Sequence, residues 1–328
     1  MAKLVTIFGG SGFLGRYIAR RMAKEGWRVR VACRRPNEAL FVRPYGAVGQ
    51  VEPVFCNIRD DASVAAAMAG ADAVVNCVGT FDKAGRNNFE AVQAEGAGRI
   101  ARLAASGGVG ALVHVSAIGA DAASDSLYAR TKAAGEAAVT AAFPGAAILR
   151  PSVMFGPQDG FFNKFAALAR FGPVLPIVGD KTRFQPVYVD DVAAAAVSAL
   201  LGGARGVYEL GGPDVATFRE LMGEMLKVVG RRRLVLNIPF WAARIKAWLL
   251  DFGSALTGRL IANRLLTVDQ VKMLRHDNVV AEGARGLADL GVAATPMPAV
   301  LPDYLWRFRP SGQYDAIKAS ARNLKNPS

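Results

Sequence analysis

The sequence predicts an α/β protein with a Rossmann-type, doubly wound parallel sheet and a smaller mixed α/β C-terminal domain. Over about the first 150 residues, short apolar runs alternate with Ala-rich, helix-like segments, and a glycine-rich turn follows the first run. After Arg150 this alternation loosens. Because strands that alternate with helices pair in parallel and are covered on both faces, the first part of the chain is expected to form the sheet.

The expected strands are apolar runs of five to eight residues. They cover residues 3–8, 28–33, 51–56, 72–79, 111–117 and 146–150. Residues 184–205 are expected to complete this first domain of residues 1–150 with a short strand that opens directly into a helix. Residues 151–302 are expected to form the smaller, interleaved docking domain, and residues 303–328 a basic tail.

Composition limits the classes of function. The chain has 328 residues and a net charge of +13, which favours acidic partners such as anionic lipid or an acidic protein surface. No DNA-reading motif accompanies the charge, so nucleic acid is not expected as a partner. Three cysteines without metal-ligand spacing and only two histidines indicate a reducing compartment and no metal site. No apolar stretch reaches the roughly 18 residues of a membrane span, and the early glycine-rich turn leaves no room for a signal peptide, so a soluble or peripheral protein is expected.

The glycine-rich turn reads "GGSGFLG" and places Gly9, Gly12 and Gly15 in a G-x-x-G-x-x-G pattern. Such a turn brings the backbone close to a pyrophosphate and points helix N–H groups at it. Phe13 and Leu14, between the last two glycines, open the helix. The position after a first strand and before a first helix makes this pattern specific for dinucleotide binding.

Two arginines, Arg34 and Arg35, follow the second strand. A site for NAD has an acidic residue here to accept hydrogen bonds from the ribose hydroxyls, whereas arginine binds a 2′-phosphate. The sequence therefore favours NADPH (NADP) as the cofactor. Beyond the third strand, Asn57 and Ile58 are expected near the adenine, and Gly79, after the fourth, allows the backbone to approach the cofactor.

A possible catalytic pair follows the fifth strand. Tyr128 and Lys132, in "YARTK", are four residues apart and share one face of a predicted helix. A neighbouring ammonium is expected to lower the pKa of the phenol, which makes it a usable acid or base. Ser116, just past the strand, could orient a carbonyl group.

These motifs together resemble the short-chain dehydrogenase/reductase superfamily, in its extended or atypical branch. The resemblance is carried by "GGSGFLG", "VNCVG", "HVSAIGA", "YARTK" and "RPSVMFGP". It implies a nicotinamide cofactor, a Ser-Tyr-Lys site and a cofactor contact at Pro151. One departure is the short segment between Ser116 and Tyr128, and another is Ala117, where many members have a second hydroxyl. The shortened segment puts a catalytic role for the serine, and a full-sized substrate pocket, in doubt.

Within that branch the sequence more closely resembles the NADPH-binding accessory subunit of respiratory complex I, and it looks like a bacterial counterpart. The distinctive stretches are "VRPYGAVGQVEPVF", "FFNKFAALARFGP", "QPVYVDDVA" and "LADLGVAATPM". This resemblance implies a tightly held, structural NADPH, other complex I subunits as partners, and a peripheral position on the cytoplasmic side of the inner membrane near the quinone site. It implies no turnover by the subunit itself.

The charge pattern of residues 231–275 is compatible with docking of the protein to a membrane or to a partner subunit. Residues 231–275 contain nine Lys or Arg and two Asp. Within them, Trp241, Ile245, Trp248, Leu249 and Phe252 are spaced on one helical face, with Arg244 and Lys246 beside it. A basic helix with such a face is typical of membrane-interface or partner-docking elements, but it is also compatible with ordinary core packing.

Two other functions stay open. The first is an active NADP-dependent reductase or epimerase that uses Tyr128 and Lys132. The second is a regulator that senses NADP(H) without catalysis.

Overall fold

The computed structural model describes residues 2–80, 85–245, 247–248, 267–310 and 312–314. The chain divides into two compact units. Unit 1 comprises Met1–Ser152, Val187–Gly211 and Val279–Ala294, and unit 2 comprises Val153–Pro186, Gly212–Asn278 and Thr295–Ser328.

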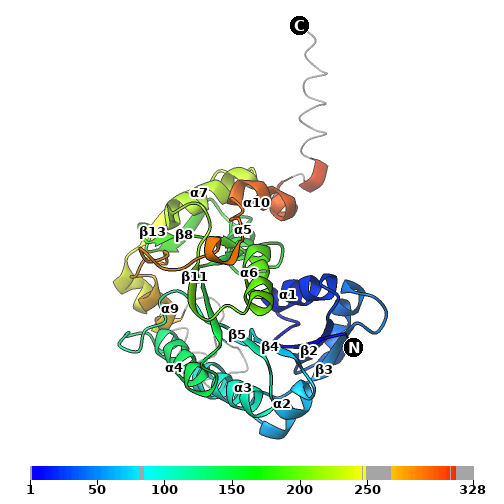
Figure 1. Ribbon diagram of the computed structural model, residues 1–328. Coiled ribbons are helices and arrows are strands. Elements are labelled where there is room, and N and C mark those ends of the chain that lie inside the picture. Colours follow the sequence, from blue (N-terminus) through cyan, green and yellow to red (C-terminus); the bar gives the residue numbers. More distant parts are fainter. Residues whose placement is uncertain (1, 81–84, 246, 249–266, 311, 315–328) are drawn as a thin grey trace. The chain divides into compact units, whose positions relative to one another are not determined.

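Unit 1 is built on a seven-stranded sheet of order β11-β6-β5-β4-β1-β2-β3, in which every neighbouring pair is parallel (Figure 1). The strands are β1 (Leu4–Phe8), β2 (Arg28–Cys33), β3 (Val51–Phe55), β4 (Ala73–Asn76), β5 (Ala111–Val115), β6 (Ala147–Pro151) and β11 (Gly206–Leu210). The central strands β1 and β4 are buried along their whole length, which explains why they read as continuous apolar runs. The predicted doubly wound parallel sheet is confirmed.

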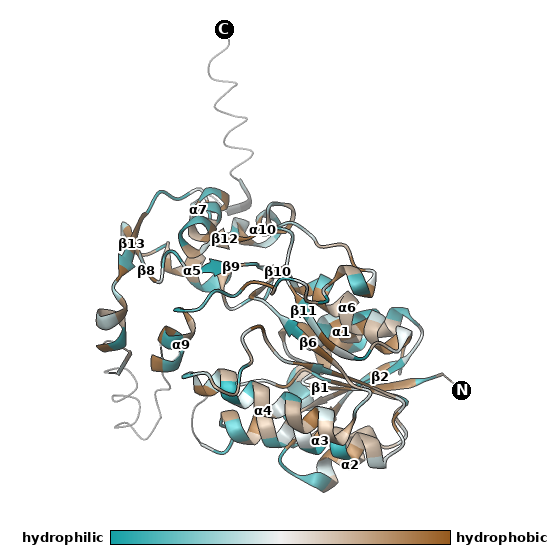
Figure 2. Cartoon of the chain, turned by 60° about the vertical axis from the view of Figure 1, so that its left-hand side comes forward, coloured by the Kyte–Doolittle hydropathy of each residue, from teal (hydrophilic) through white to brown (hydrophobic). Residues whose placement is uncertain are grey.

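Helices cover both faces of this sheet. α1 and α6 pack on one face, and α2, α3 and α4 lie on the other (Figure 2). The elements are α1 (Phe13–Lys24), α2 (Asp61–Met68), α3 (Glu95–Ser106), α4 (Leu127–Ala142) and α6 (Val189–Gly202), with the short β10 (Val187–Tyr188), the 3₁₀ segments η1 (Pro36–Tyr45) and η3 (Ala288–Leu290), and one π-helical turn, η2 (Glu90–Ala94). The predicted strand that opens directly into a helix corresponds to β10 and α6.

Local sequence signals fix the ends of these helices. Asp60 accepts a hydrogen bond from the backbone N–H of Ala62 at the start of α2, and Ser126 accepts one from Ala129 at the start of α4. Gly203 ends α6 in the left-handed conformation, with φ 66°, which glycine adopts without a steric penalty.

The stretch "RPYGAVGQ", residues 43–50, forms the end of η1 and the loop that leads into β3. Gln50, at its end, accepts a hydrogen bond from the N–H of Ala47 and donates to the carbonyl oxygens of Ala23 (2.6 Å) and Trp27 (3.0 Å). The side chain therefore links this loop to the backbone between the end of α1 and the start of β2. These contacts give Gln50 a structural role.

β11 closes one edge of the sheet by pairing with β6. Glu209 accepts hydrogen bonds from the N–H of Ala281 and from Arg150, and Arg285 lies over the ring of Tyr208 at 4.3 Å. Residues 279–285 are thereby attached to the sheet. This strand, residues 206–210, falls within the range expected for the smaller domain, but it belongs to unit 1.

Unit 2 is a smaller mixture of helices and short strands. β8 pairs in parallel with β13, and β9 pairs antiparallel with β12. The elements are β7 (Met154–Phe155), α5 (Phe162–Leu168), β8 (Val174–Val178), β9 (Arg183–Phe184), β12 (Ala216–Thr217), α7 (Phe218–Val228), β13 (Leu234–Ile238), α9 (Val268–Met273), α10 (Met297–Leu305), η4 (Trp306–Phe308) and η5 (Gly312–Tyr314).

Its core contains a cluster of phenylalanine rings beside the buried carboxylate of Asp159. Phe161 contacts the rings of Phe165, Phe184 and Phe218 at centroid distances of 5.6–6.1 Å. Asp159 accepts a hydrogen bond from the Tyr304 hydroxyl at 2.6 Å, as well as backbone N–H bonds within its own loop. This carboxylate ties α10 to the loop before α5.

Candidate functional site

The predicted glycine-rich turn lies between β1 and α1. Gly9 has φ 75°, and a Cβ atom there would lie 3.2 Å from the backbone of residues 77 and 78. A Cβ atom on Gly15 would lie 2.6 Å from Cα of Gly10 and closer still to the carbonyl oxygen of Gly9. Gly12 precedes α1 without a side-chain cap, so the first N–H groups of the helix remain available to an anion.

Phe13 and Leu14 form the first turn of α1. Leu14 is buried, and Phe13 lies edge-to-face against Tyr17 at 6.3 Å. These two predicted site residues therefore contribute mainly backbone N–H groups to the turn, while the side chain of Leu14 packs in the core and that of Phe13 packs against Tyr17.

The two arginines after β2 differ in their surroundings. Arg35 precedes η1 and forms an exposed ion pair with Glu38 at 3.0 Å. Arg34 is exposed, and within the described part of the chain it has no charged partner. Only Arg34 is therefore fully available to a ligand.

Sequence reasoning missed Arg16, one turn into α1. Its Nε donates to the carbonyl oxygen of Gly12 (3.1 Å) and its Nη2 to that of Ser11 (3.0 Å). Its guanidinium lies over the ring of Phe41 at 4.7 Å. The only sequence signal was its place directly after the third glycine.

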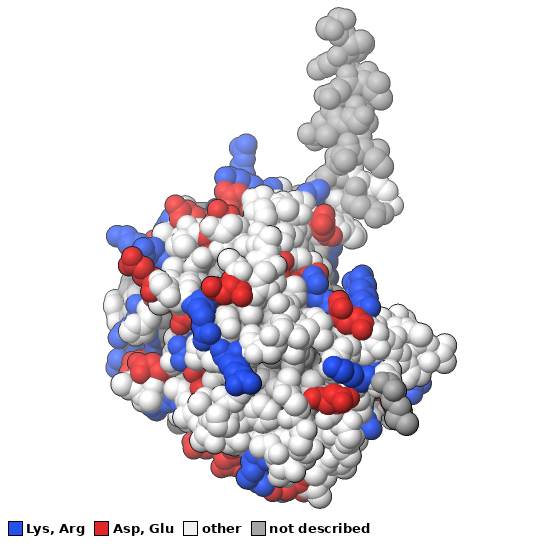
Figure 3. Space-filling view, viewed as in Figure 1, with Lys and Arg blue, Asp and Glu red and all other residues white. Residues whose placement is uncertain are grey.

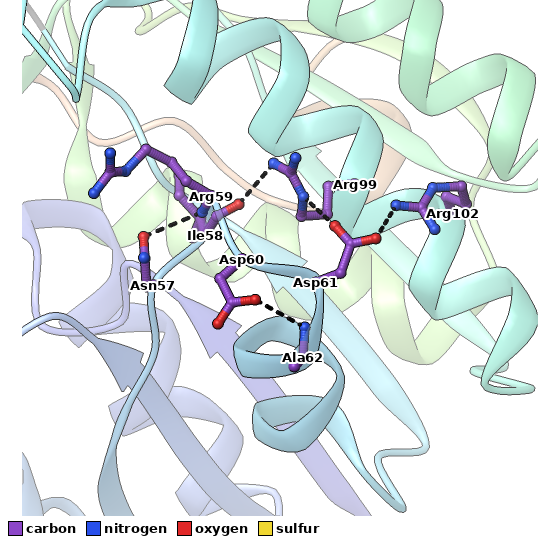
Figure 4. A network of polar contacts seen from close by, with 8 residues as sticks. All are labelled: Asn57, Ile58, Arg59, Asp60, Asp61, Ala62, Arg99 and Arg102. Atoms are coloured by element: carbon purple, nitrogen blue, oxygen red, sulfur yellow. Dashed lines mark hydrogen bonds and ion pairs between the residues drawn. The ribbon is translucent and has the colours of Figure 1, made fainter.

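Asn57 and Ile58 follow β3 and belong to a polar network (Figure 4). The side chain of Asn57 accepts a hydrogen bond from the N–H of Arg59, and the carbonyl oxygen of Ile58 accepts one from Arg99. Ile58 also packs against Gly96 of α3, where a Cβ atom would come within 3.0 Å of it. The Arg59 side chain extends away from the Asp61 ion pairs in Figure 4, and its buried Nε has no hydrogen-bond partner among the residues that the structure describes.

Asp61 holds this network to α3. It forms ion pairs with Arg99 and with Arg102, the second at 2.6 Å. Hydrogen bonds from both guanidinium groups lower the pKa of the Asp61 carboxyl, with Arg102 the larger cause. The loop that carries Asn57 and Ile58 is thus fixed in place before any ligand binds.

Buried polar side chains lie at the ends of β4 and β5. Asn76 contacts Nδ1 of His114 at 3.1 Å and accepts a hydrogen bond from the N–H of Val78. Burial, together with the nearby Lys132, lowers the pKa of His114 to about 3, so the imidazole is neutral. Neither His114 Nε2 nor the Ser116 hydroxyl has a hydrogen-bond partner among the described residues, and both atoms are buried.

Tyr128 and Lys132 lie on α4, as predicted, and reach the same region as Ser116. Lys132 Nζ donates to the carbonyl oxygen of Val115 at 3.2 Å and lies 6.0 Å from the centroid of the Tyr128 ring. It would also lie 4.0 Å from a Cβ atom on Gly79. Tyr128 packs edge-to-face on Phe89 at 5.8 Å.

The expected lowering of the Tyr128 pKa is wrong. Burial raises the pKa of Tyr128 to about 12, because removal from water disfavours the phenolate. Burial also lowers the pKa of Lys132 to about 8, so the amine remains mostly protonated at neutral pH. Sequence spacing gave the proximity of the two groups but not the loss of solvent around them.

One turn further along α4, an ion pair connects this helix to β6. Arg150 forms two hydrogen bonds with Glu136, at 2.9 and 2.7 Å, and contacts Glu209 at 3.4 Å. The next residue, Pro151, ends β6, and its carbonyl oxygen accepts a hydrogen bond from the N–H of Ile118. Pro151 thereby helps to position the segment that follows Ser116.

In unit 2, residues 240–245 and 247–248 are helical, and this helix after β13 exposes the described side chains that were predicted for docking. Ala243 and Ala247 are buried in a cluster with Val178 and Val271. The predicted apolar face is exposed instead: Trp241 is 69%, Ile245 54% and Trp248 58% accessible. Leu249, Phe252 and Lys246, from the same expectation, lie outside the described residues. Core packing therefore does not account for the described part of this face.

Two further properties bear on function. Within the described residues, no His, Cys, Asp and Glu side chains gather as a metal site, and no helix has the length and hydrophobicity needed to cross a membrane. On the face shown in Figure 3, acidic side chains are interspersed among the basic ones, so the positive excess forms no continuous patch there.

A turn shaped for a pyrophosphate at the carboxyl edge of a parallel sheet defines a dinucleotide-binding protein. The model of the NAD dependent epimerase/dehydratase family matches residues 5–211, and the chain belongs to this family. The match spans the glycine-rich turn, the Tyr128–Lys132 pair and β11.

Two relatives are named for different roles. The chain is 35% identical over 316 residues to the mitochondrial NADH dehydrogenase (ubiquinone) 1 alpha subcomplex subunit 9 of Arabidopsis thaliana. The alignment covers 94% of this chain and 79% of that protein. The chain is 32% identical over 256 residues to the ceramide reductase of Caulobacter vibrioides. That alignment covers 77% of this chain and 79% of the reductase. The resemblance to the complex I subunit is thus confirmed.

Among solved structures, the chain is similar to the dTDP-glucose 4,6-dehydratase DesIV of Streptomyces venezuelae, solved with NAD and TYD bound. The TM-score is 0.71 at 21% identity, and the match covers 96% of this chain and 99% of that one. This likeness supports the Rossmann fold.

Proposed function

We propose that the chain is an accessory subunit of respiratory complex I that binds NADPH and stabilises the complex without catalysing a reaction. Its partners are other complex I subunits and the membrane surface, on the cytoplasmic side of a bacterial inner membrane. The similarity to subunit 9 over most of both chains supports the assembly. The geometry of the site supports the cofactor and the structural role.

The residues of unit 1 fit a dinucleotide. The Gly9–Gly15 turn keeps free of side chains the space that a pyrophosphate needs at the start of α1. Arg34 supplies positive charge at the end of β2, where a 2′-phosphate binds. Asn57 and Ile58 lie at the edge suited to adenine, and Lys132 at the edge suited to the nicotinamide ribose. Bound NADPH can supply a hydride, which the proposed role does not require.

The burial of Ser116 and Lys132, beside the partly buried Tyr128, carries the structural role. The Ser116 hydroxyl is closed to solvent, so a substrate carbonyl cannot reach it in this conformation. Tyr128, with its raised pKa, remains protonated, so it could donate a proton but is a poor general base. Lys132 already donates to the backbone of β5. The three groups are arranged to support the cofactor site.

Replacing Tyr128 by Phe should leave complex I assembly and NADH-driven quinone reduction within about twofold of wild type. Phenylalanine keeps the packing against Phe89 and removes only the hydroxyl. The measurements are native gel analysis and quinone reduction in membranes, with NADPH oxidation by the isolated protein assayed against quinone and ketone acceptors. If the isolated wild type turns over NADPH and Tyr128→Phe abolishes that turnover, the structural role is wrong.

An active NADP-dependent reductase is the second candidate. It is favoured by the complete Ser116, Tyr128 and Lys132 set and by the 32% identity to a protein named ceramide reductase. It requires an opening of the site that exposes the Ser116 hydroxyl. The turnover assay above separates the two candidates.

The exposed face of the helix after β13 is proposed to attach the protein to the membrane surface. Replacing Trp241 and Trp248 together by Ala should release the protein from washed membranes at any salt concentration. At about 25 cal/mol per Å² and 150–250 Å² per aromatic side chain, burying roughly half of the two indoles is worth about 4–6 kcal/mol. Immunoblotting of membrane and soluble fractions measures the release.

Two controls test the specificity of that result. Leu201→Ala removes an exposed apolar side chain from α6, and it should leave membrane retention unchanged. Arg244→Glu should weaken retention most at low salt, where charges are least screened. Full retention of the double tryptophan variant would show that attachment lies elsewhere.

A further inference from the structure

Five arginine residues of unit 2 belong to a place where three segments of the chain meet. Nε of Arg231, just after α7, donates to the carbonyl oxygen of Phe308 at 2.9 Å, and Nε of Arg309 donates to that of Val228 at 2.8 Å. These reciprocal bonds join the end of α7 to residues 308–309. The arginine cluster consists of Arg170, Arg231, Arg232, Arg233 and Arg309.

The third segment is the loop between α5 and β8. Nε of Arg233 donates to the carbonyl oxygen of Ala169 at 2.8 Å, and the N–H of Leu234 donates to that of Pro173 at 3.0 Å. β13 begins here and pairs with β8 (Figure 2). The side chain of Phe171, in the loop, is 75% accessible, and that of Leu234 is 66% accessible. Two exposed apolar side chains therefore accompany the arginine cluster.

No carboxylate neutralises the arginine cluster within the described part of the chain. Residues 168–173, 229–234 and 305–310 contain six Arg and no Asp or Glu. The cluster takes part in none of the ion pairs that the described residues form. Backbone carbonyl groups hold three of the five guanidinium groups, but each guanidinium has five N–H donors, so donors remain for an anion.

We propose that the arginine cluster, with Phe171 and Leu234, is a docking surface for an acidic face of another protein subunit. This inference rests on the proposed function as a subunit of complex I, and it adds the surface and the chemistry of the partner. Carboxylates match the cluster because a planar guanidinium binds a carboxylate through two parallel N–H···O bonds. Aromatic and Arg side chains are also the types that are enriched in protein–protein interfaces.

A folded partner suits this cluster better than a lipid surface. Backbone carbonyl groups already fix Arg231, Arg233 and Arg309, so little conformational entropy is lost on binding. Fixed guanidinium groups favour carboxylates that are themselves fixed in a fold, whereas mobile lipid headgroups are attracted by charge alone. Phe171 and Leu234 lie on a loop and a strand, and they lack the amphipathic helix that binds in a membrane surface.

The first test is cross-linking of the full chain in its native membranes, with Leu234 replaced by a photoreactive benzoylphenylalanine. Mass spectrometry then identifies the linked peptides. We expect links to an Asp- or Glu-rich segment of another complex I subunit. Lysine in place of those carboxylates should weaken association, and combining that change with Arg170→Glu/Arg232→Glu should restore it.

The second test reverses two charges of the cluster. The side chains of Arg170 and Arg232 are exposed and form no hydrogen bond with the described residues, so Arg170→Glu/Arg232→Glu should fold. On native gels, the fraction of the chain that migrates with NADH dehydrogenase activity should fall at least about tenfold, and most at low salt. The matched control, Arg20→Glu/Arg28→Glu, reverses two exposed charges of unit 1 and should keep that fraction within about twofold of wild type.

Thermal unfolding of each variant checks the fold. If Arg170→Glu/Arg232→Glu is unstable, Arg170→Gln/Arg232→Gln takes its place, since it removes the charges without reversing them. Unchanged migration of the folded variant with the complex would overturn the proposal, as would cross-links to peptides without acidic residues. Flotation with phosphatidylglycerol vesicles covers the other partner: loss of flotation with unchanged migration would assign the cluster to lipid.

Failure of the proposed function has a different result. A wild-type chain that migrates apart from the NADH dehydrogenase activity would refute the role in complex I itself. A wild-type chain that migrates with this activity, together with a variant that does the same, would refute only the role of the arginine cluster.

Discussion

Replacing Gly15 by Ala should reduce the affinity for NADPH more than a hundredfold and destabilise the protein by about 1–3 kcal/mol. The added methyl group would overlap backbone atoms of Gly9 and Gly10, which cannot rotate away as a flexible side chain can. α1 would have to move away from the turn, and its N–H groups would no longer point at the pyrophosphate. Nucleotide titration and urea unfolding measure the two effects.

Gly223→Ala is the matched control. Gly223 lies inside α7, and no atom lies within 4 Å of a Cβ added there. Alanine should stabilise this helix by up to about 1 kcal/mol without changing NADPH binding. Normal NADPH affinity and stability in Gly15→Ala would mean that the start of α1 is not the anion site.

Replacing Arg150 by Met should destabilise the protein by roughly 3–5 kcal/mol, the usual cost of leaving a buried charge without its partner. Glu136 and Glu209 have side-chain accessibilities of only 9% and 13%, and Arg150 is the cation that contacts both. Methionine retains much of the side-chain volume, so the loss reports mainly on the unpaired carboxylates. Urea unfolding at neutral pH measures it.

The double variant Arg150→Met/Glu136→Gln separates charge from packing. Removing one carboxylate should recover a substantial part of the lost stability, since the amide is cheaper to bury than a charge. Arg35→Gln, at an exposed ion pair, should change stability by less than about 1 kcal/mol. Equal losses for the single and double Arg150 variants would assign the effect to packing alone.

The features that were predictable from the sequence depend on neighbouring residues. The strand runs end in turns, the glycine pattern lies between a strand and a helix, and Tyr128 and Lys132 share a face because a helix repeats every 3.6 residues. These signals gave the fold and most positions of the candidate site.

The features that were missed depend on contacts between distant residues. Arg16 is fixed by Phe41, 25 positions later, in a segment without a regular apolar pattern. The pKa of Tyr128 depends on burial, to which Phe89 contributes. Along the helix after β13, periodicity identified an aromatic face, but only the packing of Ala243 and Ala247 shows which side is buried.

The late position of β11 in the chain affects synthesis on the ribosome. Until residues 206–210 have left the exit tunnel, the outer edge of β6 has no partner strand, and the segment of residues 279–285 that packs on β11 emerges later still. An open strand edge can pair with another nascent chain, so the growing polypeptide is exposed to aggregation during this interval. A fragment cut after Arg150 for expression would keep that edge open permanently. Such a fragment should be insoluble even though it contains the whole glycine-rich turn.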